Sequence, residues 1–78
     1  MALSTKIKNE IKKNIQVSKS LEWATSLLQE MNDEVNLQKV LQIKKDYEKE
    51  AFNIMRQNNI STIDVFPTKN SCVTLTLS

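Results

Sequence analysis

The chain contains no glycine, and this absence constrains its fold more than any residue that is present. Glycine normally supplies the left-handed backbone of tight turns and helix ends, because it lacks a Cβ. Glycine-rich phosphate-binding loops are therefore excluded, and asparagine, which tolerates the left-handed conformation, is expected to replace glycine where a helix ends. The chain also has a single proline, Pro67, so little in it interrupts a helix.

The residues needed for catalysis or metal binding are largely missing. The chain has no histidine, so its serines and threonines lack the base that would activate them. No cluster of cysteines, histidines and carboxylates has the spacing of zinc ligands. Paired carboxylates need a cleft, and the acidic residues are explained more simply by helix capping and a solvated surface. We expect no enzyme: no catalytic residue, no cofactor and no metal.

The single cysteine, Cys72, cannot form a disulfide within the chain. We expect its side chain to be a small buried apolar group rather than a reactive thiol. A free thiol fits a reducing compartment. No apolar run approaches the ~20 residues that span a bilayer, and the start has no apolar region of signal-peptide type. We therefore expect a soluble cytoplasmic protein that does not bind membranes.

Helical spacing of apolar residues predicts a first helix over about residues 4–31. In its first half the apolar stripe is Ile7, Ile11 and Ile15, whereas in its second half a heptad pattern includes Leu21 and Leu28. The stripe therefore shifts near residues 18–20, where a kink or a break is conceivable. We favour one continuous helix.

A second helix is predicted over about residues 35–58, with a broad apolar face and Asn58-Asn59 at its end. The chain then becomes rich in β-branched residues, and Val73, Leu75 and Leu77 alternate with polar residues. Residues 67–70 resemble a turn, which predicts a β-hairpin over about residues 60–77, with a frayed tail as the alternative. The expected fold is mainly α: one domain, residues 1–78, with a long antiparallel helical hairpin followed by a C-terminal β-hairpin.

Two helices and a two-stranded hairpin leave much apolar surface uncovered in a chain of 78 residues. The apolar face of the second helix is wider than one neighbouring helix can cover. We expect a homodimer in which two helical hairpins form a four-helix bundle, although a different protein could take the place of the second chain.

Several residues are candidates for contact with a partner. Lys44 and Glu48 interrupt the apolar face of the second helix, either as a solvated ion pair or as a polar device that fixes register. Trp23 and Leu27 lie away from the main stripe of the first helix, where they either widen the core face or anchor a partner. The partner-binding hypothesis comprises Trp23, Leu27, Leu41, Lys44, Glu48, Phe52 and Met55.

The first helix is basic, which supports an alternative function. Residues 1–20 hold five lysines and one glutamate, a net charge of +4, whereas residues 21–50 hold seven acids and four lysines, a net charge of −3. A dimeric regulator could bind nucleic acid through this basic helix, although pairing with the acidic segment explains the charges more simply. The candidate residues are Lys6, Lys8, Lys12, Lys13 and Lys19.

The sequence therefore favours a small non-catalytic protein–protein interaction module: an adaptor, an inhibitor or an assembly factor. The lysine-, asparagine- and isoleucine-rich composition is typical of AT-rich genomes, which suggests a bacterial or phage origin.

Overall fold

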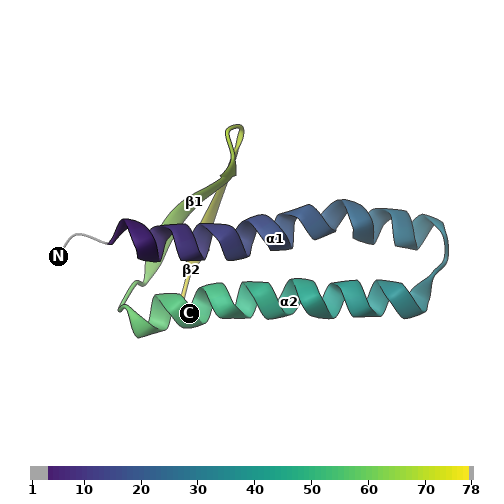
Figure 1. Cartoon of the computed structure of the whole chain (residues 1–78), viewed down its shortest axis with the longest axis horizontal. Helices are drawn as coiled ribbons and strands as arrows, with labels where there is room; N and C mark the ends of the chain where they lie inside the picture. The colour runs from purple at the N-terminus through teal and green to yellow at the C-terminus, as the bar shows by residue number, and fades with distance from the viewer. Residues whose placement is uncertain (1–3, 78) are drawn as a thin grey trace.

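The computed structural model describes residues 4–77 and contains two long helices followed by a two-stranded antiparallel sheet (Figure 1). Helix α1 spans Thr5–Glu30, helix α2 spans Glu34–Gln57, strand β1 spans Thr62–Thr68 and strand β2 spans Ser71–Thr76. The helices lie side by side and antiparallel, and the strands pack across the N-terminal half of α1. The predicted fold class is confirmed, and α1 is continuous through residues 18–20.

Helix α1 ends in a Schellman motif, the arrangement that usually requires glycine in the left-handed position. Asn32 takes that position with a φ of 58°. The Asn32 N–H donates to the Gln29 carbonyl at 3.1 Å, and the Asp33 N–H donates to the Leu28 carbonyl at 3.0 Å. The chain therefore reverses direction after α1 without a glycine.

Helix α2 ends in the same way. Asn59 has a φ of 56°, and its N–H donates to the Arg56 carbonyl at 3.3 Å. The Ile60 N–H donates to the Met55 carbonyl at 2.9 Å, and the side chains of Ile60 and Met55 both belong to the buried core. The predicted end of the second helix at Asn58-Asn59 is confirmed.

Asp33 links the two helices by capping the start of α2. Its carboxylate accepts the backbone N–H of Asn36 at 3.2 Å and the side-chain amide of Asn36 at 2.7 Å. These hydrogen bonds hold the pKa of the Asp33 carboxyl below its ordinary value. Asp33 thus satisfies one of the N–H groups that a helix start leaves unpaired.

The buried core lies at the end of the molecule where the strands cover the helices. The predicted stripe is confirmed there, since Ile11 and Ile15 are both buried. Val73 and Leu75 of β2, and Leu77 directly after it, pack toward the same core. Eight apolar residues form it: Ile11, Ile15, Ala51, Ile54, Met55, Ile60, Val65 and Leu75.

Pro67 and Thr68 lie in β1 rather than in the turn, so the prediction of a turn over residues 67–70 was wrong at both. The tight turn consists of Lys69 and Asn70. The strands pair with Val65 opposite Val73, and the register shifts between Val65 and Thr68. A proline is tolerated at such an irregularity because it has no N–H to give to the ladder. Pro67 is buried, and its carbonyl accepts the side-chain amide of Gln16 at 3.1 Å.

Cys72 is exposed, so the prediction of a buried cysteine was also wrong. The reason is the alternation of β2. Because Val73, Leu75 and Leu77 face the helices, Cys72, Thr74 and Thr76 face solvent. The packing of Val73, Leu75 and Leu77 against the core therefore leaves the thiol of Cys72 in solvent.

We predict that Asn32→Ala and Asn59→Ala each lower the free energy of unfolding by about 1–2 kcal/mol, because a Cβ without a polar group disfavours left-handed backbone. Asn32→Gly and Asn59→Gly should be nearly neutral. Asn9→Ala is the control, since Asn9 is an exposed residue of α1 with helical backbone. Urea unfolding measures all five variants, and equal losses for alanine and glycine at positions 32 and 59 would contradict the prediction.

Candidate interaction surface

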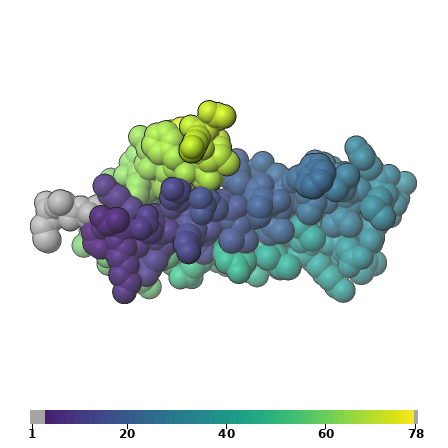
Figure 2. Space-filling model, turned by 45° about the horizontal axis from the view of Figure 1, so that its top comes forward, coloured from purple at the N-terminus to yellow at the C-terminus, as the bar shows by residue number. Residues whose placement is uncertain are grey.

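The helical hairpin is covered on only part of its length. The β-hairpin sits on the first half of α1, and the second half extends beyond it uncovered (Figure 2). Ser18 is the last fully buried residue of α1 and Ala51 is the first of α2. Residues 19–50, which we call the distal half, therefore contain no fully buried residue.

The distal half exposes most of the large apolar side chains that the described part of the chain leaves in solvent. Isolated exposed apolar residues are common in monomers and need no explanation. Here six such residues lie within one part of the helical hairpin, where no other element packs on the two described helices. Their exposed fractions are Trp23 74%, Met31 70%, Val35 69%, Ile43 45%, Leu27 40% and Tyr47 39%.

Trp23, Leu27 and Met31, the C-cap residue of α1, are spaced by four residues and so share one side of the helix, which we call the α1 stripe. All three are exposed. The interpretation of Trp23 and Leu27 as core residues was therefore wrong for the chain on its own. The half-buried residues of this part of α1 are Leu21, Ala24, Thr25 and Leu28.

Trp23 lies about 200° around the helix from Leu21, which explains why it does not reach α2. Its role as an anchor for a partner stays a prediction.

A second stripe lies on α2. Val40, Ile43 and Tyr47 are spaced by three and four residues, so they share one side of that helix. Val40 is half-buried, whereas Ile43 and Tyr47 are exposed. We call these three residues the α2 stripe. The broad apolar face predicted for the second helix therefore extends beyond what α1 covers, and Ile43 and Tyr47 are members that the partner-binding hypothesis omitted.

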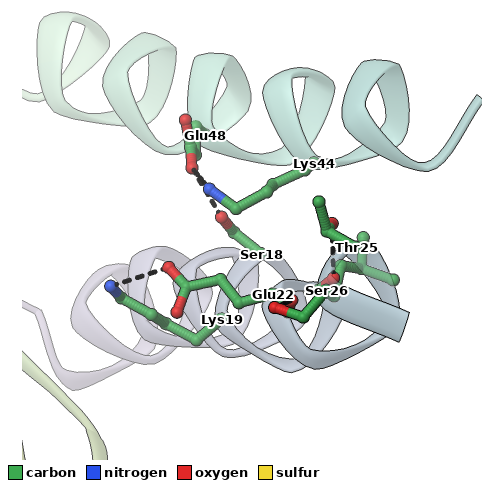
Figure 3. A network of polar contacts seen from close by, with 8 residues as sticks. Ser18, Lys19, Glu22, Thr25, Ser26, Lys44 and Glu48 are labelled. Atoms are coloured by element: carbon green, nitrogen blue, oxygen red, sulfur yellow. Dashed lines mark hydrogen bonds and ion pairs between the residues drawn. The ribbon is translucent and has the colours of Figure 1, made fainter. Parts of the chain in front are cut away.

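Ser18, Lys44 and Glu48 form a polar layer between the helices (Figure 3). The Ser18 hydroxyl donates to Oε1 of Glu48 at 2.7 Å, and Nζ of Lys44 donates to the same oxygen at 2.6 Å. Ser18 is only 4% exposed, and the side chain of Lys44 is 22% exposed. The layer therefore lies partly inside the helix pair, at the boundary between the buried core and the distal half.

The polar layer shifts the ionisation of Glu48. Partial burial raises the pKa of its carboxyl, but the hydrogen bonds from Lys44 and Ser18 outweigh burial, so the pKa lies below its ordinary value. Glu48 is thus ionised at neutral pH and accepts both hydrogen bonds. Whether the layer also fixes register between chains stays a prediction.

The remaining partner candidates differ in accessibility. Met55 is 0% exposed and lies in the core, so its assignment to partner binding was wrong. The reason is that Met55 lies at the covered end of α2. Phe52 is half-buried and packs against the same core, beside a hollow of about 170 Å³ that Arg56 and Leu77 also line. Leu41 is half-buried in the distal half.

The lysines of the alternative hypothesis are all exposed, but they are not equivalent. Lys19 forms an ion pair with Glu22 at 3.1 Å, which neutralises its charge locally. Lys12 lies beside the turn of the β-hairpin, where it meets Lys69 across a surface hollow. The other candidates, Lys6, Lys8 and Lys13, lie along the exposed surface of α1.

Within residues 4–77, no three histidine, cysteine or carboxylate residues come together as a metal site would require. Neither α1 nor α2, as described, is both long and apolar enough to cross a bilayer. Comparison of the chain with protein-family models, with curated proteins and with solved structures found no match. The function must therefore be argued from the surface itself.

We predict that Trp23→Ala changes the free energy of unfolding by less than about 0.5 kcal/mol, because an exposed side chain contributes little to folding. Ile15→Ala is the contrasting variant and should cost about 2–5 kcal/mol, because Ile15 lies in the core. Thermal and urea unfolding measure both. A loss for Trp23→Ala as large as that for Ile15→Ala would mean that Trp23 is a core residue.

We also predict that Glu48→Gln weakens the acid sensitivity of the fold. A carboxyl whose pKa is lowered by folding contributes stability above its ordinary pKa, near 4.3, and loses it as the pH falls through the lower folded value. The unfolding free energy of the unaltered protein should thus fall more steeply below about pH 5 than that of the variant. Glu50→Gln, at an exposed position on the same helix, is the control. Parallel pH profiles for the protein and Glu48→Gln would contradict the prediction.

Proposed function

We propose that this protein is a small non-catalytic interaction module that works as a homodimer and serves as an adaptor, inhibitor or assembly factor. The observation that carries the proposal is the amount of surface left exposed. The chain exposes 5844 Å², whereas a monomer of 9.0 kDa is expected to expose about 4,900 Å². Its radius of gyration is 14.0 Å, against about 11.5 Å expected for this length.

The exposed surface area in excess of that expected for a monomer is similar to the area that one partner buries in a standard protein interface, about 800 Å². The distal half supplies the apolar side chains for such an interface. A partner covering it would give the second part of the helical hairpin the third layer that it lacks.

Self-association is best supported at the α2 stripe. Ile43 and Tyr47 widen a helix face that already packs against α1, so a second helix pair docked there would continue the same apolar interior. A twofold axis would place the α2 stripes of two chains against each other and complete a four-helix bundle. The polar layer of Ser18, Lys44 and Glu48 would then lie close to this interface, where such groups restrict the register of packed helices.

The α1 stripe remains available for a different protein. Tryptophan is enriched among the residues that dominate binding energy at interfaces, and an exposed Trp23 with Leu27 and Met31 beside it offers such an anchor. An apolar pocket or groove on the partner would receive it. A bacterial or phage origin and a cytoplasmic location remain predictions from composition.

The test of self-association is the molar mass by light scattering over a concentration series. We expect a dimer for the unaltered protein and a monomer for Ile43→Glu with Tyr47→Glu, because two buried carboxylates would oppose packing. Gln38→Glu with Gln42→Glu adds the same charge at exposed positions of α2 and should stay dimeric.

A monomer at every concentration would overturn the homodimer. Dissociation by both double variants would show that added charge, not the α2 stripe, controls assembly.

A further inference from the structure

A hollow on the surface lies where the turn of the β-hairpin meets α1. It has a volume of about 350 Å³ and is lined by Lys12, Gln16, Phe66, Pro67, Thr68 and Lys69. We call it the turn pocket. Ligand pockets typically measure about 300–1,000 Å³, so its size suits a single ring system with its substituents.

The turn pocket combines two cations from distant parts of the sequence. Lys12 comes from α1 and Lys69 from the turn between β1 and β2. None of the six described lining residues is acidic. The acid nearest along β1, Asp64, accepts the hydroxyl of Thr74 at 2.6 Å. An anionic group placed in the pocket would therefore meet two lysines without a competing carboxylate among its walls.

An exposed aromatic ring completes the pocket. Phe66 is 55% exposed beside the two lysines. The exposed part of the phenyl ring provides a flat apolar face on which a base can stack. Gln16 and Thr68 add groups that can hydrogen-bond the edge of a base or a sugar hydroxyl. The side-chain amide of Gln16 also donates to the Pro67 carbonyl at 3.1 Å, which ties the pocket wall to α1.

We propose that the turn pocket binds a nucleotide unit of single-stranded nucleic acid, with the base on Phe66 and the phosphate between Lys12 and Lys69. An acidic peptide would satisfy the lysines but would leave the ring unused. A duplex would present phosphates but keep its bases stacked inside. An unpaired strand offers an anion and a free aromatic face together. Lys8, exposed one helical turn before Lys12, extends the positive surface for a neighbouring phosphate. The site is independent of the proposed dimer, since neither apolar stripe contributes to it.

The test is fluorescence anisotropy of a short labelled single-stranded oligonucleotide titrated with the intact protein at several salt concentrations. Lys12→Gln with Lys69→Gln should weaken binding and reduce the slope of log affinity against log salt by about 0.7, the value for one neutralised phosphate of a single strand. Lys39→Gln with Lys45→Gln removes the same charge from exposed positions of α2 and should leave affinity and slope unchanged.

Phe66→Ala should lower the affinity about tenfold at every salt concentration without changing the slope, since stacking is not ionic. Lys69→Gln alone, in the exposed turn, is the second variant if the double substitution fails to fold, and circular dichroism checks each protein. A polyglutamate of equal charge and a duplex of the same sequence should compete weakly.

Four outcomes would overturn the proposal. These are no binding at low salt, equal losses for the pocket and control pairs of lysines, no effect of Phe66→Ala, and competition by polyglutamate or duplex as strong as by the single strand.

Discussion

The packing of the β-hairpin against one end of the helix pair determines most other features of the molecule. The hairpin contributes Val65 and Leu75 to the core, and the segment between α2 and β1 contributes Ile60. These side chains pack with Ile11 and Met55 of the two helices. Among residues 4–77, the fully buried apolar side chains all lie at this end of the helix pair, where the strands add a layer that excludes water. The strands cross the helices over the first half of α1, so the contact that creates the core leaves the other end of the helix pair exposed.

The polar layer marks the limit of this core. On one side of Ser18 and Glu48 lie fully buried apolar residues, and on the other side the helix interface is only half-buried. A buried hydroxyl without an acceptor would be costly, and Glu48 supplies the acceptor for Ser18. Replacing such a group of polar residues by apolar ones often preserves or improves stability. A role of this layer in restricting how the helices pack stays a prediction.

Sequence patterns predicted the architecture well because it depends on local periodicity. The Ile7–Ile11–Ile15 stripe, the alternation of Val73, Leu75 and Leu77, and the left-handed Asn59 were all readable from the chain. The predictions of buried and exposed residues failed where exposure depends on tertiary packing. Met55 and Trp23 are both apolar helix residues, but the hairpin covers one and not the other.

The turn pocket could not be seen in the sequence, because Lys12 and Lys69 meet only after the chain folds back on itself. Basic and aromatic residues do not alternate along the chain, and the fold brings them together instead. Phe66 is exposed because burial alternates along β1, with Val65 and Pro67 buried on either side of it.

The uneven covering of the helices also has a dynamic consequence. Backbone amides in residues 19–50 are protected by helical hydrogen bonds but by no fully buried side chain, so this end should open many times for each global unfolding event. Hydrogen exchange would then be slow near the strands and fast toward the connection between the helices. The end that offers Trp23 and Tyr47 to other molecules is thus also the end with the most freedom to adjust, and a partner bound there would be recorded as a local slowing of exchange.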